Sequence, residues 1–496
     1  MRNNNHADHF NNLFKLKDKS IYREQCYING KWVGSENGEV IKVFNPADDS
    51  LLGYVASVGA VETRLAISAA EEALVTWRTS TAKSRCEIIR LWHDLIIENK
   101  DDLALLLTSE QGKPFSESLD EVNYAASFLS WFSEEGKRTY GDVIPSDKND
   151  RKYIVVKEPV GVCAAITPWN FPLAMITRKA APALAAGCTL ILKPAEQTPY
   201  SALALAELAD RAGVPAGVFN VLVGNAQEIG AELTKSKVVK KLTFTGSTDI
   251  GKLLMRQCAD TVKKLSLELG GNAPFIVFDD ADIDSAIQGV IDSKFRNSGQ
   301  TCICTNRLLV HHDIYEIFIE KLVLGVSSLQ LGNGLDSGVT IGPLIDRSAI
   351  AKITSHIEDA LSLGARLCIG GIVDKKGGNF FEPTVICDVT NEMLVASEET
   401  FGPLLPIFKF HNDEEAIDMA NSTDFGLAGY FFSRDIGRIW NVADRLEVGM
   451  VGVNTGLIST EAAPFGGFKQ SGLGREGSKY GIEDYMQTKY ICMAGL

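Results

Sequence analysis

Short apolar segments without polar alternation recur along the middle of the chain, and helical patterns separate them. The apolar segments are 161–167, 189–193, 218–223 and 241–246. A strand that is buried on both faces needs no polar alternation, so this pattern predicts a parallel sheet covered by helices on both sides. We therefore expect an α/β, doubly wound fold of the nucleotide-binding type.

Local signals predict several element boundaries. Asn29-Gly30 is a strong turn pair, so residues 28–34 predict a β-hairpin. Apolar residues at spacings of three and four predict helices between about 62 and 135. Thr198 is a suitable cap for a helix whose first residue is Pro199.

A second α/β unit follows the first. Its expected elements are a strand in PFIVFDD, a helix over 281–297, a strand in NRLLVH and a helix in YEIFIEKLVLGVSSL. The resulting division is a dinucleotide-binding domain over 21–137 and 159–270, and a second domain over 271–470. Two segments, 138–158 and 484–496, read as extended, and we expect these open edges to pair with another subunit.

Residues 1–20 are expected to be a mobile leader. They lack the apolar core of a signal peptide, and Asp8 and Asp18 are unusual in a transit peptide. Ten cysteines in 496 residues are too few for a disulfide framework, which favours a reducing, cytoplasmic location.

The charge balance limits the possible partners. Lys and Arg number 49 and Asp and Glu number 63, so the net charge is −14. We expect no binding to nucleic acid, because no run of five like charges supplies a local basic patch. We also expect no membrane span, because prolines, Trp169 and Asn170 interrupt the longest uncharged stretch, residues 159–177.

Two short motifs carry residues suited to catalysis. Cys302 lies in GQTCIC, and Glu268 lies in LELGGN at the expected end of a strand. A cysteine nucleophile must be partly exposed and stabilised as a thiolate. An apolar setting raises the pKa of a carboxyl group and suits it to act as a general base. Taken singly, each residue is more often structural than catalytic.

Other patterns are weaker. TGSTDIG, residues 245–251, lies where a strand becomes a helix, a place that binds phosphate, and a plain helix cap is equally compatible with it. The literal GxGxxG at 472–477 follows no expected strand and reads as a flexible glycine loop. Seven scattered histidines predict no metal site.

The motifs taken together resemble the aldehyde dehydrogenase superfamily. PWNFP, FTGSTDIG, LELGGNAP, FRNSGQTCIC and EETFGP occur in that order, and the resemblance extends from about 27 to 490. It is closest to the succinate-semialdehyde dehydrogenases. The resemblance implies a catalytic role for the domain over 271–470, an oligomerisation role for the extended segments, and a homodimer or homotetramer. It implies that Cys302 attacks the aldehyde, Asn170 stabilises the oxyanion, and Glu268 activates water to hydrolyse a thioester.

The resemblance also implies a nicotinamide cofactor. The residues implied in its binding are Trp169, Lys193, Glu196, Gly246, Ser247, Leu269, Glu399 and Phe401. Glu196 suits the ribose 2′-OH and repels a 2′-phosphate, so we expect NAD to be favoured over NADP, with NADP still possible.

The resemblance implies a substrate with a second charged group. Arg178, Arg296 and Ser459 match the positions that bind the far carboxylate of succinate semialdehyde. The alternative for each arginine is an ordinary ion pair with a surface acid, and the alternative substrate is glutarate semialdehyde. Cys304 is either a packing residue or the partner of Cys302 in a regulatory disulfide.

Overall fold

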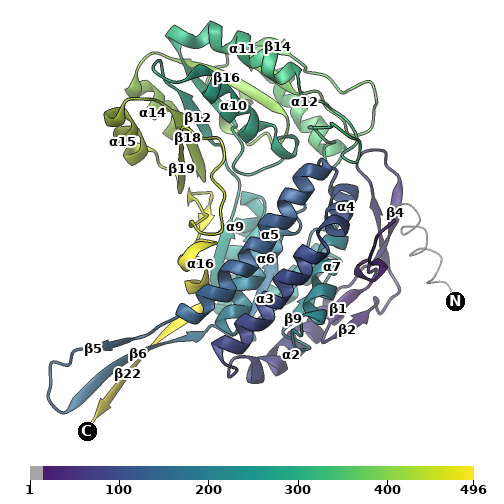
Figure 1. Cartoon of the computed structure of the whole chain (residues 1–496), viewed down its shortest axis with the longest axis vertical. Helices are drawn as coiled ribbons and strands as arrows, with labels where there is room; N and C mark the ends of the chain where they lie inside the picture. The colour runs from purple at the N-terminus through teal and green to yellow at the C-terminus, as the bar shows by residue number, and fades with distance from the viewer. Residues whose placement is uncertain (1–14, 496) are drawn as a thin grey trace.

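The computed structural model describes residues 15–495 and consists of two lobes and a projecting arm (Figure 1). The first lobe is built on a sheet of order β2-β1-β9-β8-β7-β10-β11-β21. Its strands are β1 (Cys26–Ile28), β2 (Lys31–Val33), β7 (Val162–Ile166), β8 (Thr189–Lys193), β9 (Phe219–Val221), β10 (Val239–Thr245), β11 (Lys264–Glu268) and β21 (Gly472–Leu473). The five strands from β9 to β11 are parallel, so the predicted doubly wound fold is confirmed.

Helices cover both faces of this sheet. Helices α6 (Ala174–Ala186) and α7 (Pro199–Arg211) pack on one face, backed by α3 (Ala82–Glu98), α4 (Lys100–Gln111) and α5 (Phe115–Glu135). Helices α2 (Ala60–Trp77), α8 (Ala226–Lys235) and α9 (Thr248–Cys258) lie on the other face. No helix in the described part of the chain is both long and apolar enough to cross a bilayer.

The second lobe has a sheet of order β14-β15-β16-β13-β12-β18-β19. Its strands are β12 (Pro274–Val277), β13 (Arg307–His311), β14 (Arg366–Ile369), β15 (Thr384–Cys387), β16 (Leu404–Phe410), β18 (Ala428–Phe432) and β19 (Met450–Val453). Its helices are α10 (Ile283–Lys294), α11 (Tyr315–Ser327), α12 (Arg347–Ser362), α13 (Leu394–Ser397), α14 (Asp413–Asn421) and α15 (Ile436–Arg445). Only β14 runs antiparallel to its neighbour, and a disulfide joins Cys368 on β14 to Cys387 on β15, a pairing that the sequence did not indicate.

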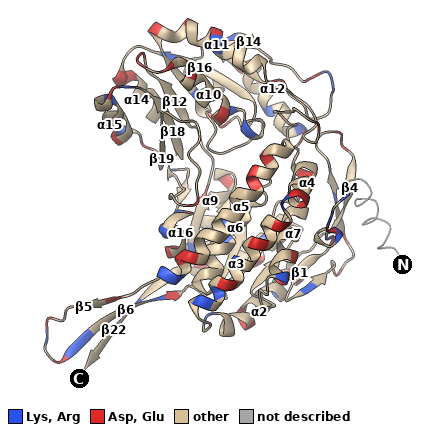
Figure 2. Cartoon of the chain, viewed as in Figure 1, with Lys and Arg blue, Asp and Glu red and all other residues tan. Residues whose placement is uncertain are grey.

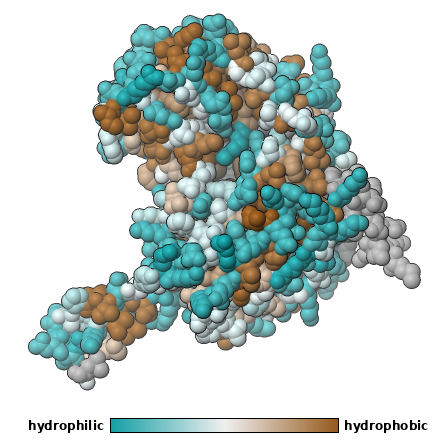
Figure 3. Space-filling model, viewed as in Figure 1, coloured by the Kyte–Doolittle hydropathy of each residue, from teal (hydrophilic) through white to brown (hydrophobic). Residues whose placement is uncertain are grey.

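The arm contains the two segments predicted to be extended. Strands β5 (Asp142–Ile144), β6 (Arg151–Pro159) and β22 (Met486–Ala494) form one antiparallel sheet, in which β6 lies in the middle. Apolar side chains cover part of the arm's surface (Figure 3). Val143, Ile144 and Ile491 of its strands are 76%, 45% and 37% exposed. The segments therefore pair with each other within the chain, and their pairing with another subunit stays a prediction.

Three local expectations are settled by the structure. Asn29 and Gly30 both have positive φ angles, of 50° and 72°, and join β1 to β2 as predicted. Pro199 begins α7, but the Thr198 side chain makes no cap. Instead the Glu110 carboxylate accepts hydrogen bonds from the backbone N–H groups of Tyr200 and Ser201, both at 2.8 Å.

The predicted leader is too long at its C-terminal end. The backbone N–H groups of Lys17 and Asp18 donate to Asp102 at 3.1 and 2.8 Å, and Arg211 pairs with Asp18 at 2.5 Å. Residues 17–20 therefore belong to the folded lobe, and residues 1–14 of the predicted leader lie outside the described residues.

Charged residues of both signs are interspersed over α3 and α5 in the face shown in Figure 2. A buried ion pair lies beneath this surface. Lys113 Nζ is 2.5 Å from Glu121 Oε2, and neither side chain is exposed. Glu121 Oε1 also accepts hydrogen bonds from the N–H groups of Leu173 and Ala174, at 2.9 and 3.3 Å, and so caps α6.

Because a buried charge without its partner is costly, Lys113→Met is expected to destabilise the protein by about 3–5 kcal/mol, measured from the urea unfolding midpoint. The double variant Lys113→Met/Glu121→Gln should recover part of this loss, since it removes the orphaned charge and keeps an acceptor for α6. Lys83→Ala breaks an exposed pair with Glu87 and should change stability by no more than about 0.5 kcal/mol. Equal effects of Lys113→Met and Lys83→Ala would contradict this account.

Candidate active site

The carboxyl ends of four parallel strands place polar residues along one edge of the first sheet. Ile166 pairs with Lys193 across β7 and β8, and Thr245 pairs with Glu268 across β10 and β11. Phe244 of β10 pairs with Ile166 of β7. Trp169 and Asn170 therefore follow β7 at the same edge at which Lys193 and Glu268 end their strands. Open α/β sheets bind ligands at this edge, where the strand order reverses.

Cys302 lies on a loop of the second lobe that follows a left-handed turn. The expected helix over 281–297 ends at Lys294, because Asn297, Ser298 and Gly299 take positive φ angles of 52°, 56° and 73°. A Cβ atom on Gly299 would lie 2.2 Å from the Gly402 carbonyl oxygen, so this position requires glycine. The turn brings Cys302 to the first lobe.

A glycine turn joins the two candidate catalytic residues. A Cβ atom on Gly271 would lie 2.3 Å from the Cys302 carbonyl oxygen, so the turn that follows Glu268 packs directly on the cysteine backbone. Cys302 is partly exposed, whereas Glu268 is 3% exposed and its Oε2 has no hydrogen-bond partner among the described residues. The structure thus brings a thiol and a carboxyl group from different lobes to one place.

Asn170 is held by its backbone. Its carbonyl oxygen accepts hydrogen bonds from Lys113 Nζ at 2.8 Å and Asn297 Nδ2 at 3.1 Å, and its side-chain Nδ2 donates to the Gln300 carbonyl at 3.0 Å. The amide therefore lies beside the loop that carries Cys302, with a side-chain N–H group directed at that loop.

Trp169, Leu269, Glu399 and Phe401 are further predicted cofactor residues. Glu399 Oε1 accepts a hydrogen bond from the Gly271 N–H at 3.0 Å, and the rings of Trp169 and Phe401 meet edge to face at 5.6 Å. Leu269 packs against α9, since a Cβ atom on Gly251 would lie 2.4 Å from its Cδ2. Glu399 therefore contacts the turn that follows Glu268, and Leu269 is the first residue of that turn.

The remaining predicted cofactor residues lie farther along the edge. Lys193 Nζ is 3.3 Å from Glu196 Oε1, and the Glu196 side chain is 40% exposed. Gly246 and Ser247 precede α9, and Ser247 is its N-cap but makes no side-chain capping bond. A helix N-terminus without a side-chain cap, at the carboxyl end of a strand, can bind a phosphate group.

Comparison with known proteins agrees with this geometry. Residues 32–491 match the model of the aldehyde dehydrogenase family. The chain belongs to the aldehyde dehydrogenase family. It is 60% identical to the glutarate-semialdehyde dehydrogenase of Pseudomonas aeruginosa over 97% of this chain and 100% of the relative. It is also 60% identical to the succinate-semialdehyde dehydrogenase [NADP(+)] GabD of Escherichia coli over 97% and 99% of the two chains. The crystal structure of a succinate-semialdehyde dehydrogenase from Burkholderia pseudomallei superposes with a TM-score of 0.96, at 59% identity over 97% of this chain and 99% of that chain.

The two predicted arginines of this aldehyde dehydrogenase are not surface ion pairs. Arg178 is 1% exposed, its Nε lies 2.5 Å from Glu476 Oε2, and its Nη2 has no hydrogen-bond partner among the described residues. The guanidinium group of Arg296 lies over the Phe171 ring at 5.4 Å, and its buried Nε also has no partner there. Ser459 is half-buried and, with both arginines, is close to Tyr124.

Sequence reasoning missed Glu476, which lies inside the literal GxGxxG segment. Its carboxylate is buried and pairs with Arg178 and Lys179. Burial and the Glu476 charge raise the pKa of Glu268 well above its ordinary value. The spacing of the glycines did not predict a role for Glu476, because this residue occupies a variable position of the motif. The segment itself is ordered, with β21 paired to β11.

Cys304 is buried and does not face solvent. Its Sγ is 3.4 Å from the Gly299 carbonyl oxygen, and the buried amine of Lys294 lies 3.9 Å from the sulfur. Cys302 and Cys304 are both free thiols.

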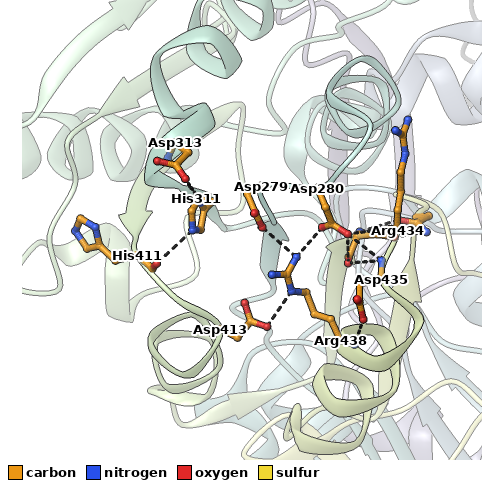
Figure 4. A network of polar contacts seen from close by, with 11 residues as sticks. Asp279, Asp280, His311, Asp313, His411, Asp413, Arg434, Asp435 and Arg438 are labelled. Carbon is orange, nitrogen blue, oxygen red and sulfur yellow. Dashed lines mark hydrogen bonds and ion pairs between the residues drawn. The ribbon is translucent and has the colours of Figure 1, made fainter.

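Three consecutive residues at the end of β13, His311, His312 and Asp313, form a group of potential metal ligands. Ligand atoms of His311, His312 and Asp313 lie within 4.8 Å of one another (Figure 4 shows two of them). His311 Nδ1 accepts from the Asp313 N–H at 3.3 Å, which places the ring proton on Nε2, 3.2 Å from the His411 carbonyl oxygen. Both nitrogens of His311 are thus engaged, and the absence of a resident metal stays a prediction.

The pKa of Cys302 depends on its burial and on the nearby charged groups of Glu399 and Arg178. Burial and, to a smaller extent, the Glu399 carboxylate raise the pKa of the Cys302 thiol to about 12, and Arg178 opposes this rise. Burial likewise raises the pKa of Glu399, to about 7. Glu399 therefore opposes the thiolate only when it is itself ionised.

Glu399→Gln is expected to lower the pKa of Cys302 and to increase its alkylation rate by iodoacetamide at pH 8, since each pKa unit changes the thiolate fraction about tenfold. At pH 6, where most of Glu399 is protonated, the variant and the wild type should react at similar rates. Glu398→Gln, a change at the exposed neighbour, should have no effect at either pH. A slower reaction of Glu399→Gln at pH 8 would contradict the assignment.

Proposed function

We propose that this aldehyde dehydrogenase oxidises succinate semialdehyde to succinate with a nicotinamide dinucleotide. The observation that carries the proposal is the pair of guanidinium groups, Arg178 and Arg296, each of which has a buried nitrogen, Nη2 and Nε respectively, without a hydrogen-bond partner among the described residues. A planar carboxylate accepts two parallel N–H bonds, so it suits such groups better than an uncharged chain end does.

Cys302 begins the reaction. Its thiolate attacks the aldehyde carbon and forms a thiohemiacetal, whose oxygen carries the developing negative charge. Asn170 is the side-chain donor at this oxygen, together with the Cys302 N–H, and each such donor lowers the barrier by about 3–4 kcal/mol. Oxidation of the adduct leaves a thioester on the same sulfur.

The dinucleotide, when bound, supplies the hydride acceptor for that oxidation. Gly246 and Ser247 would hold its pyrophosphate, and Lys193 and Glu196 would hold the adenosine ribose, with Trp169 beside them. Glu399 would bind the other ribose, with Leu269 and Phe401 packed nearby. The uncapped α9 N-terminus and the Lys193–Glu196 pair support the pyrophosphate and adenosine-ribose assignments.

Glu268 completes the cycle. Its raised pKa makes it a base strong enough to take a proton from water, and the resulting hydroxide hydrolyses the thioester. Both Cys302 and Glu268 must lose a proton to act, so kcat/KM rises with pH on the alkaline side of neutrality.

Glutarate semialdehyde is a second candidate substrate. It is favoured by the relative from Pseudomonas aeruginosa, which is as similar to this chain as the one from Escherichia coli. The two substrates differ by one methylene, which changes the binding free energy by only about 1–3 kcal/mol.

Arg296→Ala is expected to raise KM for succinate semialdehyde about 10- to 100-fold, because a charge-assisted hydrogen bond is lost. Butanal, which has the same chain length and no carboxylate, should be oxidised with nearly unchanged kcat/KM. Arg178→Ala should act in the same direction, although it also removes a partner of Glu476. Equal losses for the two aldehydes would refute the carboxylate assignment.

We also propose that NAD is favoured over NADP, although the relative from Escherichia coli is named for NADP(+). The Glu196 carboxylate would repel a 2′-phosphate. Since its side chain is 40% exposed and paired with Lys193, the effect is modest, and Glu196→Ser should improve kcat/KM with NADP about 3- to 10-fold. A wild-type enzyme with higher kcat/KM for NADP would contradict the proposal.

A regulatory disulfide between Cys302 and Cys304 remains a prediction, and it requires Cys304 to leave Lys294. Peroxide should inactivate the wild type in a way that dithiothreitol reverses, and Cys304→Ala should lose this reversibility. Identical behaviour of both proteins would remove the switch.

The arm favours assembly into a homodimer or homotetramer, because its apolar side chains are exposed in the single chain. A cytoplasmic location is proposed from the cysteine content alone.

A further inference from the structure

Tyr124 is a buried phenol that the proposed mechanism does not use. It lies on α5, and its Oη has no hydrogen-bond partner within residues 15–495. Its ring meets Phe128 edge to face at 4.9 Å, and Phe128 also lies beneath the guanidinium group of Arg178, at 5.6 Å. Phe128 therefore contacts both the Tyr124 ring and the guanidinium group of Arg178, which is predicted to bind the substrate.

The groups that face Tyr124 come from several elements. Arg178 of α6 and Arg296 lower the pKa of the phenol, while burial and, to a smaller extent, Glu476 raise it, and the net shift is upward. The Ser459 hydroxyl is also close enough to lower this pKa, although the pair does not reach hydrogen-bonding geometry. The phenol therefore keeps its proton at neutral pH and is a donor.

The charged neighbours of Tyr124 offer its hydroxyl no free acceptor. An arginine side chain has no acceptor atom, so neither Arg178 nor Arg296 can take the Tyr124 proton. Glu476 is already ion-paired with Arg178 and Lys179. Arg178 Nη2, Arg296 Nε and Tyr124 Oη are all left without partners, and an anion with several lone pairs is what would satisfy them together.

We propose that the Tyr124 hydroxyl donates a hydrogen bond to the far carboxylate of the aldehyde and helps to select carboxylated substrates. This inference rests on the proposed function. A buried donor left unpaired by an uncharged aldehyde penalises that aldehyde, so the hydroxyl raises selectivity beyond what the two arginines supply.

The test is Tyr124→Phe, which removes one oxygen and keeps the ring that packs on Phe128. Specificity constants for succinate semialdehyde and butanal are measured in the same preparation, so their ratio does not depend on the fraction of folded enzyme. We expect the ratio to fall about 10- to 100-fold, mainly through KM for the semialdehyde. Succinate, added as an inhibitor, should bind more weakly by a similar factor.

Tyr315→Phe is the matched control. It removes a buried hydroxyl from the second lobe that contacts Asp388, and it should leave the ratio unchanged. An unchanged ratio in Tyr124→Phe, or equal losses for both aldehydes, would overturn the role of Tyr124 while leaving the proposed function intact. A wild-type enzyme that does not prefer succinate semialdehyde to butanal would overturn the proposed function itself.

Discussion

The close packing of two backbone segments from different lobes is the constraint on which the rest of the site depends. The turn at Gly270-Gly271 lies against the Cys302 carbonyl, and the Gly271 N–H binds Glu399. Any side chain at position 271 would separate the segments. Because the turn directly follows Glu268 at the end of β11, the same contact sets the distance between the base and the sulfur. Catalysis is therefore a property of the interface between the lobes.

Buried charge is concentrated around this interface. Lys113 and Glu121 position Asn170 and the start of α6, and Glu476 neutralises Arg178 and Lys179 beside Glu268. Burying these ions costs desolvation free energy, and apolar side chains in the same places would not carry that cost. Burial, reinforced by the Glu476 charge, raises the pKa of Glu268, and the buried arginine and lysine side chains provide cationic nitrogens that an apolar core cannot supply.

The order of strands and helices was predictable because the spacing of apolar residues differs between a buried strand and a helix. The apolar segments at 162–166 and 189–193 are buried on both faces, and Asn29-Gly30 takes the turn that its residues favour. The family motifs also indicated which residues lie together at the carboxyl ends of the strands. Contacts between distant segments were not predictable: the Glu110 cap on α7 joins residues 90 positions apart, and the ion pair between Lys179 and Glu476 joins residues 297 positions apart. The unpartnered Tyr124 hydroxyl was likewise not predictable, because its neighbours come from several distant segments. The pairing of β6 with β22 was missed for the same reason, since open edges in a sequence do not reveal their partner.

The central claim is that Cys302 carries the acyl group and that Glu268 releases it. The most direct measurement is intact-protein and peptide mass spectrometry of Glu268→Gln after mixing with succinate semialdehyde and NAD. The account predicts one equivalent of NADH, almost no further turnover, and a succinyl group on the peptide that contains Cys302. Sustained turnover without an adduct, or an adduct on another residue, would contradict it.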